Sequence, residues 1–472
     1  MTEGRTSKAG GAPQATEMAK ANPLGYEKIG KLIFRFSMPA ILSNLVNAIH
    51  NIVDQIYIGH GIGTAGIAAT NIAFPLVTIT TSIALLVGVG ASTAFNLNLG
   101  AGHTKKAEKL AGNGIVLCAV CGFIVSVLSC MFMTPILKAF GANAEIIDLA
   151  REYTFIIALG FPFQVLTVGL CQLIRSDGSP NWASGSMMAG AIFNIIFDYV
   201  FMFGFGWGIK GIGWATTLGQ VLASSLASLY LIRGLKSIKL TKDAFKLSPP
   251  IIKEICSLGI AGFVNQISQS IVQITLNNTL RHYGELSRYG STIPLAAVGA
   301  IGKIGVFYIM CNVGVGQGCQ PIYGFNYGAK NYARVKETLK MAISCMMVIS
   351  LLFFTALQLF PRQIISVFGQ GSEAYYDFAV RYIRIAMFMT IVNGFQPAGS
   401  GYFTSTGRVM KGMFITMTRQ LIFLLPLLLI LPYFFGIDGV VFAAPTADSI
   451  SAVISIWMIR SEMKRLDGLI AT

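Results

Sequence analysis

The sequence predicts an all-α polytopic membrane protein with twelve transmembrane helices in two six-helix lobes. Its composition is 54% hydrophobic and only 12% charged, with a mean hydropathy of +0.65. A soluble domain averages about 25% charged residues. Apolar runs long enough to cross a bilayer recur twelve times, and the second half of the chain repeats motifs of the first half.

The apolar runs divide the chain into two halves of six spans each. We expect the spans at residues 32–58, 66–96, 111–136, 153–174, 184–205, 211–233, 254–280, 293–323, 339–360, 378–403, 413–435 and 437–459. The domains predicted from them are a disordered cytoplasmic tail (1–27), an N-lobe (28–233), a basic cytoplasmic linker (234–253), a C-lobe (254–462) and a cytoplasmic tail (463–472).

One constant offset of 228 residues relates the two halves. It aligns "GVGASTAFNLNLGAG" (88–102) with "GQGCQPIYGFNYGAK" (316–330), and "GIKGIGWA" (208–215) with "GIDGVVFA" (436–443). Because each half has an even number of spans, the lobes share one orientation and are related by a pseudo-two-fold axis along the membrane normal. Rocking of two such lobes alternates the access to a cavity between them, which is typical of transporters.

The net charge of +15 is explained by membrane topology. Most of the 35 Lys and Arg residues lie in the N-terminal tail, the even-numbered loops and the C-terminus. The positive-inside rule then predicts a multi-pass protein of the cell inner membrane with both termini in the cytoplasm, and nucleic-acid binding is not expected. All eight cysteines lie in apolar segments, and Cys118-x-x-Cys121 has no second pair beside it, so these thiols are interpreted as packing residues.

Span 1 contains an aspartate, Asp54, that a bilayer penalises by about 2.5 kcal/mol or more. At 100° per residue it shares an arc of about 80° with Asn44, Asn47 and Asn51, and His50 extends this stripe. The three amides have an alternative structural role, since Asn side chains join helices through interhelical hydrogen bonds. Asp54 itself predicts a functional site.

Spans 5 and 6 supply a second polar group in the same half. Asn194 and Asp198 lie one turn apart on one face, and Thr216 lies in the next span. Two carboxylates that share a site with amide and hydroxyl oxygens can carry a proton or can ligate Na⁺. Pro39 lies fifteen residues before Asp54 and removes a helix hydrogen bond, so we expect a bend that acts as a conformational hinge.

The second half lacks matching aspartates, because an offset of 222 pairs Asp54 with Leu276. Polar and charged residues of this half are candidates for the substrate cavity, together with Asn44 and Asn47 of the first half. They are Gln266, Gln269, Gln273, Lys303, Arg419 and Asp448. Lys303, Arg419 and Asp448 have an alternative interpretation as a paired structural set, with the Arg419 side chain reaching toward the interface.

Four motifs make the chain similar to a known family. They are "NIVDQIYIGHGIGTAGIAA" (51–69), "NLNLGAGHTKKAEK" (96–109), "RSDGSPNWA" (175–183) and "NIIFDYVFMFGFGWGIKGIGWAT" (194–216). Over residues 28–462 the chain resembles multidrug and toxic compound extrusion (MATE) transporters of the DinF-like or MepA-like kind. The resemblance implies two six-helix lobes in a V, and efflux driven by entry of Na⁺ or H⁺ without another cofactor.

The resemblance also assigns roles to residues. It implies a coupling site for H⁺ or Na⁺ formed by Asp54, Asn194, Asp198 and Thr216. His50 and Asn51 are candidates for a coupling relay, although His50 is not part of the family motif. Some branches have an acidic residue in helix 7, where this chain has glutamines, so a coupling site in the C-lobe is not implied.

The sequence thus predicts a monomeric secondary active transporter that exports small organic, mainly cationic compounds across the bilayer in exchange for H⁺ or Na⁺. A lipid-linked oligosaccharide flippase is an alternative, because Lys303 and Arg419 could bind a diphosphate headgroup. An intramembrane enzyme is a remote alternative, since the sequence contains neither HExxH nor GxGD. A channel is disfavoured by the two-lobe repeat.

Overall fold

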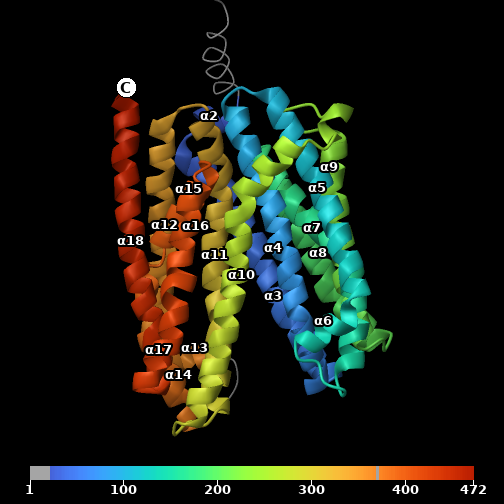
Figure 1. Cartoon of the computed structure of the whole chain (residues 1–472), viewed down its shortest axis with the longest axis vertical. Coiled ribbons are helices and arrows are strands. Elements are labelled where there is room, and N and C mark those ends of the chain that lie inside the picture. Colours follow the sequence, from blue (N-terminus) through green and yellow to red (C-terminus); the bar gives the residue numbers. More distant parts are fainter. Residues whose placement is uncertain (1–21, 368–371, 472) are drawn as a thin grey trace, which may run out of the picture.

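The computed structural model describes residues 22–367 and 372–471, and within them all regular secondary structure is helical. Eleven helices are long and apolar enough to cross a membrane, and one bent helix pair makes a twelfth span. The predicted all-α fold with twelve membrane helices is therefore confirmed. Figure 1 shows the two lobes side by side, with α3, α4, α10 and α11 in the middle.

The N-lobe consists of the six spans before the linker. They are α3 (Ile29–Gly61), α4 (Thr64–Gly100), α5 (Thr104–Met131), α7 (Ile147–Ser176), α8 (Pro180–Tyr199) with its π-helical continuation η1 (Val200–Gly204), and α9 (Ile209–Arg233). The short helix α6 (Met133–Ala139) connects α5 to α7, and the 3₁₀ helix η2 (Lys242–Phe245) lies in the linker.

The C-lobe repeats this order with more interruptions. Its first three spans are α10 (Pro249–Glu285), α11 (Thr292–Gly328) and α12 (Tyr332–Leu359), followed by the short α13 (Pro361–Ser366). The fourth consists of α14 (Glu373–Ala386), the 3₁₀ helix η3 (Phe388–Val392) and α15 (Phe395–Ser405). The fifth consists of α16 (Val409–Met417), the π-helix η4 (Thr418–Leu424) and α17 (Leu425–Phe435), and the sixth is α18 (Ile437–Ala471).

The span predicted at 378–403 is not one continuous helix. Its two parts meet at an angle of 44° between Val392 and Phe395. Pro397 has no N–H to donate to the carbonyl of Asn393, so the regular hydrogen-bonding pattern fails at this point. The break matters for the site described below, because it brings the Asn393 side chain to a buried aspartate.

Glycines that the internal repeat shares form the contact between the lobes. A Cβ atom on Gly90 of α4 would lie 2.0 Å from the Ile255 oxygen of α10. The aligned Gly318 of α11 packs against α3 in the same way, because a Cβ atom added to it would lie 2.6 Å from the Ser37 nitrogen. Only glycine allows helix backbones to approach so closely.

A second aligned glycine pair lies where α4 and α11 meet each other. The Cβ of Gly100 would lie 2.0 Å from the Phe325 oxygen, and that of Gly328 would lie 2.1 Å from the Leu97 oxygen. Since Leu97 and Phe325 are also 228 residues apart, the contact is nearly self-complementary about the pseudo-two-fold axis. The lobes therefore close against each other at the end of α4 and α11 that lies near the linker.

The other half of the interface is open. Lys303 of α11 lies on the same side of its helix as Gly314, whose Cβ would meet Ile41 of α3, and yet Lys303 is exposed, as is Asn51 of α3. Lys303 lies about four turns before Gly318 along the same helix. The molecule is thus closed between its lobes at one end and open at the other.

The predicted termini and linker require three corrections. Residues 23–26 form the helix α2 (Pro23–Tyr26), and the Arg334 guanidinium donates to the carbonyls of Leu24 (3.1 Å) and Glu27 (2.6 Å), so this part of the predicted disordered tail is ordered. Residues 1–21 of that tail lie outside the described residues. Helix α10 begins at Pro249, inside the predicted linker, and α18 continues through the predicted C-terminal tail to Ala471.

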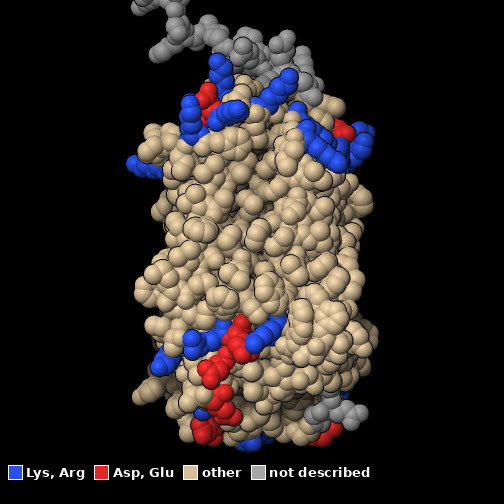
Figure 2. Space-filling model, turned by 90° about the vertical axis from the view of Figure 1, so that its right-hand side faces the viewer, with Lys and Arg blue, Asp and Glu red and all other residues tan. Residues whose placement is uncertain are grey.

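On the face of the molecule drawn in Figure 2, the charged side chains lie at its two ends. Figure 2 shows a broad band without Lys, Arg, Asp or Glu between a mainly basic end and an end with both signs of charge. An uncharged band is what the hydrocarbon core of a bilayer requires. Helix α2 and the C-terminal end of α18 lie at the same end of the molecule (Figure 1).

Candidate functional site

Asp54 lies inside the N-lobe bundle. On α3, Ser37 faces α11 and donates to the Val315 oxygen (3.4 Å). Asp54 is 17 residues further along, which at 100° per residue turns it about 100° away from that face. It is buried, and its Oδ2 lies 3.2 Å from His50 Nε2, one turn earlier. The side chains of Asp54 and His50 are therefore in direct contact.

Helices α8 and α9 hold the other three predicted cation-site residues together. Asn194 Nδ2 donates to Asp198 Oδ1 (3.3 Å) and to Thr216 Oγ1 (3.1 Å), and Asp198 is fully buried. The helices approach closely at Gly190, where a Cβ would lie 2.6 Å from the Gly219 oxygen. The π-helical turn η1 begins two residues after Asp198, and π-turns are frequent at functional sites.

The two aspartates meet in the middle of this bundle. The carboxyl groups of Asp54 and Asp198 are close enough to interact electrostatically with each other. Tyr153 of α7 is close enough to interact electrostatically with both and packs beside Tyr57 and Ile58. Nothing in the sequence singles out Tyr153, since a tyrosine in an apolar span has many structural roles. Four helices of the N-lobe thus contribute to one site.

The oxygens of this site fit a bound H⁺ or Na⁺. Asp54 Oδ1, Asn194 Oδ1 and Asp198 Oδ2 are buried and have no hydrogen-bonding partner among the described residues. Two adjoining carboxyl groups in a low-dielectric site require a compensating positive charge. Oxygen ligands of this kind are those that hard cations prefer. His50 is the basic group in contact with the pair, and its Nδ1 is also unpartnered among the described residues.

The amides of span 1 do not all belong to this site. Asn44 donates to Gln317 of α11 (3.4 Å) and joins the two lobes, while Asn47 donates to the Ser43 carbonyl (2.8 Å). Asn51, predicted as a relay to Asp54, instead donates to the Asn47 carbonyl (2.7 Å) and is exposed. Since Asn51 lies within about 40° of the α11-facing direction of α3, it lines the open part of the interface.

The opposite wall of this open interface belongs to the C-lobe. Gln266, Gln269 and Gln273 lie within about 80° of Gly259, which marks the α4-facing side of α10. Gln269 donates to Asn265 Oδ1 (3.2 Å), and Gln273 donates to Asn277 Oδ1 (3.0 Å). We use the name interlobe cleft for the space between the two lobes at this end of the interface. Helices α3 and α4 of the N-lobe lie on one side of it, and helices α10 and α11 of the C-lobe lie on the other.

Lys303 also faces the interlobe cleft. It lies within about 20° of Gly314, whose Cβ would lie 2.5 Å from the Ile41 side chain of α3, and it is exposed. The cleft therefore has amides on both walls and one lysine on the C-lobe side.

Arg419 and Asp448 form the ion pair that one interpretation of the sequence predicted. Arg419 Nε lies 2.6 Å from Asp448 Oδ1, and Asn393 Nδ2 donates to Asp448 Oδ2 (2.7 Å). Asp448 is buried, whereas about 30% of the Arg419 side chain is exposed. Tyr308 lies near this pair and contacts Ser350 (2.9 Å between hydroxyl oxygens). The C-lobe thus contains a carboxylate with its own internal cation.

Both lobes of this chain match one known protein family. The MatE family model matches residues 39–200 and 263–430, one stretch in each lobe. The chain belongs to the MatE family. MATE proteins are transporters, so the prediction that the chain is not an enzyme is confirmed together with the family.

Two kinds of relatives agree with this membership. The multidrug export protein MepA of Staphylococcus aureus is 25% identical over 436 residues, which cover 92% of this chain and 94% of that protein. A transporter of the MOP superfamily from Pyrococcus furiosus has a similar structure, with a TM-score of 0.86, 22% identity and coverage of 98% of this chain and 100% of that one. A multidrug resistance MATE transporter described as outward-facing also gives a TM-score of 0.86 at 22% identity, covering 98% and 99%. The two structures show likeness of fold.

Proposed function

We propose that this MATE transporter exports organic, mainly cationic compounds and is driven by H⁺ or Na⁺ that binds at Asp54 and Asp198. The observation that carries the proposal is the adjoining pair of carboxyl groups with three unpartnered oxygens around it. A purely structural carboxylate in a membrane is expected to have a fixed partner, as Asp448 has in Arg419. The relative named as a multidrug export protein supports the substrate class.

The way the lobes meet supports alternating access as the mechanism. The glycine contacts close one end of the interface, and toward the other end Asn51 of α3 and Lys303 of α11 are exposed. If the basic end faces the cytoplasm, as the positive-inside rule predicts, this conformation opens to the outside. Separation of the glycine contacts and closure of the opposite end would then give the inward-open form.

The residues of the N-lobe would couple the driving ion to this movement. When positive charge is bound, Asp54 and Asp198 can stay together in the bundle, held by His50 and Asn194. When it leaves, the two carboxylates repel each other and favour a rearrangement of α3 against α8. A cationic compound in the interlobe cleft would be attracted by the same negative charge, so substrate and driving ion favour different states.

The flippase alternative receives less support. It depended on Lys303 and Arg419 as two free cations, and Arg419 is neutralised by Asp448. Of these two cations, Lys303 is the one that is exposed on the cleft wall without a carboxylate partner among the described residues.

The experiment is efflux of a cationic dye from proteoliposomes under separately imposed pH and Na⁺ gradients. Wild type should respond to at least one gradient, whereas Asp54→Asn and Asp198→Asn should insert and fold but lose gradient-driven efflux. The neutral amides keep the shape of the carboxyl groups and are cheaper to bury. Asp148→Asn is a matched control, because Asp148 is exposed in the first turn of α7. Full gradient-driven efflux by the Asp54→Asn, Asp198→Asn double variant would refute the proposal.

A further inference from the structure

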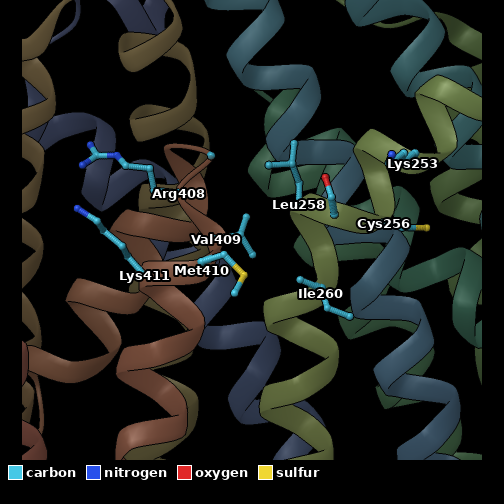
Figure 3. Close-up of a pocket in the computed structure, with 10 residues that line it drawn as sticks. Lys253, Cys256, Leu258, Ile260, Arg408, Val409, Met410 and Lys411 are labelled. Atoms are coloured by element: carbon cyan, nitrogen blue, oxygen red, sulfur yellow. The ribbon is translucent and has the colours of Figure 1, made fainter.

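A cavity of about 780 Å³ lies between α10 and α16, outside the carboxylate site and the interlobe cleft. In Figure 3, Val409 and Met410 of α16 point toward α10, and Leu258 and Ile260 of α10 lie opposite them. Arg408 and Lys411 lie on one flank of these apolar residues, and Lys253 lies on the other. The cavity therefore has an apolar middle and basic flanks.

Two of the three flanking cations have no carboxylate partner among the described residues. Arg408 is paired with Glu462 (Nη2 to Oε1, 2.7 Å). Lys411 Nζ lies 5.8 Å from the centre of the Phe403 ring, which leaves its charge uncompensated, and Lys253 has no acidic partner. The neighbouring Glu254 is instead paired with Lys106 (2.8 Å). Lys253 and Lys411 therefore leave uncompensated positive charge on both flanks of the cavity, which can attract an anionic ligand.

The cavity lies at the depth of lipid headgroups. Lys253 is in the second turn of α10 and Lys411 is in the first turn of α16, and both helices continue as membrane spans. Met410 is 69% exposed and Phe414, one turn further into the span, is 47% exposed, so this side of α16 presents apolar surface to the bilayer. A ligand that enters from the membrane meets lysines at the rim and apolar residues below.

We propose that this cavity binds an anionic phospholipid. The acyl chain packs against Leu258, Ile260, Val409 and Met410, and the charges of Lys253 and Lys411, on opposite flanks of the cavity, create a positive potential that attracts the anionic headgroup. Basic pockets between membrane helices bind such headgroups. Free inorganic phosphate shares the charge but cannot use the apolar wall, so the lipid is the occupant that fits both features.

The bound lipid would stabilise the conformation in which this end of the interface is closed. The turn that forms one edge of the cavity packs on the N-lobe, since a Cβ on Gly407 would lie 3.2 Å from Leu97 Cδ1 of α4 and 4.0 Å from Leu258 Cδ2 of α10. Movement of the lobes apart would remove Leu97 from this contact and change the cavity. A ligand that binds one state better shifts the equilibrium toward it.

The test compares lipid binding to the full-length protein in detergent by native mass spectrometry and by thermal unfolding. Phosphatidylglycerol should bind more tightly than phosphatidylcholine and should raise the melting temperature. The Lys253→Gln, Lys411→Gln variant should bind phosphatidylglycerol about 25-fold more weakly, at about fivefold for each lysine. Lys239→Gln with Lys242→Gln removes the same charge from the linker and should leave binding unchanged.

A second variant tests the apolar wall. Ile260→Trp fills the cavity and should reduce binding of phosphatidylglycerol although both lysines are retained. Equal binding of the two lipids by wild type, or unchanged phosphatidylglycerol binding in the double lysine variant, would overturn the proposal. Displacement of phosphatidylglycerol by millimolar inorganic phosphate would assign the site to phosphate and would also overturn it.

Discussion

Asp198 and Asp448 are buried carboxylates in the two lobes, and they differ in what balances their charge. Asp448 contacts the Arg419 guanidinium and the Asn393 amide, both supplied by other helices of the C-lobe. Asp198 contacts the Asn194 amide and adjoins a second carboxyl group, that of Asp54. The first is neutralised by the chain itself, whereas the second needs a cation from solution. This asymmetry favours the N-lobe as the place where the driving ion is exchanged.

Removal of the Arg419 charge should reduce the stability of the protein. Arg419→Gln leaves Asp448 buried without its cation and should reduce the free energy of unfolding by about 3 kcal/mol. Adding Asp448→Asn should restore most of it, because the buried group is then neutral. Thermal unfolding in detergent, followed by tryptophan fluorescence, measures both effects. If Arg419→Gln is as stable as wild type, Arg419 does not compensate the buried charge of Asp448.

His50 should tune the coupling site without being indispensable. His50→Gln keeps a side chain that can hydrogen-bond to Asp54 but removes the titratable group in contact with it. We expect efflux to continue with an altered pH profile, measured as initial dye efflux between pH 5.5 and 8.5. Complete loss of efflux at every pH would give His50 an essential part in the coupling step.

At the scale of helices, irregular segments lie beside each polar centre. The π-helix η1 follows Asp198, and the π-helix η4 contains Arg419. The break between η3 and α15 presents Asn393 to Asp448. Helix α3, in contrast, continues through Pro39 from Ile29 to Gly61 as one helix. Its role as a hinge remains a prediction.

Pro39→Ala tests that role. Alanine restores the missing backbone hydrogen bond and favours a straight α3, so we expect slower efflux at nearly unchanged stability. The measurement is the efflux rate of proteoliposomes with equal protein density, beside the melting temperature in detergent. Wild-type efflux rates from the variant would contradict a hinge at this position.

The end of the linker, residues 244–248, is held to the N-lobe by the buried side chain of Asn113. Asn113 Nδ2 donates to the carbonyls of Ala244 and Lys246 (3.0 Å each), and its Oδ1 accepts from the Ser248 N–H (2.9 Å). Asn113→Ala should cost about 1–3 kcal/mol and expose residues 239–248 to protease. Limited proteolysis measures the cleavage rate.

Asn143→Ala is the control for the linker experiment. Asn143 also accepts from two backbone N–H groups, those of Glu145 and Ile146, but it is exposed and far from the linker in sequence. Its removal should leave linker cleavage unchanged. Equal cleavage rates in wild type and Asn113→Ala would contradict the proposed anchor.

At the scale of the whole molecule, the two lobes meet through glycine pairs that the internal duplication repeats. The closest approach is at Gly259 of α10, where a Cβ would lie 1.7 Å from the Leu86 oxygen of α4. Its equivalent on α3 at offset 222 is Ser37, whose backbone meets Gly318. The same pair of contacts therefore occurs twice about the pseudo-two-fold axis.

Gly259→Leu should prevent this closure. A backbone carbonyl cannot move aside as a flexible side chain does, so the variant should favour conformations in which α4 and α10 are apart. Overpacking of this kind costs about 1–3 kcal/mol. We therefore expect the efflux rate to fall at least about tenfold. Gly185→Leu is a matched control, since a Cβ there meets nothing within 4 Å. Distances between spin labels on α4 and α10 report the change. An unchanged distance distribution would contradict the role of Gly259.

Orientation is a further property of the whole molecule. The charge distribution predicts that position 243 lies in the cytoplasm. In a variant without the eight native cysteines, a cysteine at position 243 should react with a membrane-impermeant maleimide only after the cells are opened. Labelling from outside intact cells would reverse the assignment.

The sequence by itself determined the properties that depend on composition and local order. Long apolar runs predicted the twelve helices, because backbone polar groups in lipid must be satisfied within a helix. The 228-residue offset predicted the two lobes, and the motifs identified Asp54, Asn194, Asp198 and Thr216. Pro23–Tyr26 and the break before α15 were missed, because short helices and helix breaks depend on contacts with distant residues.

The tertiary structure alone decided which polar groups meet. The stripe of span 1 looked like one face in sequence, yet Asp54 turns into the N-lobe and Asn51 faces the cleft. Tyr153 lies near the two carboxyl groups, and Arg419 forms an ion pair with Asp448, which is 29 residues further along the chain. No local sequence pattern predicts the distance between either set of side chains. A helical period gives the direction of a side chain relative to its own axis only. Which neighbour lies in that direction is decided by the packing of the other helices, and this packing separates an exchangeable charge from a balanced one.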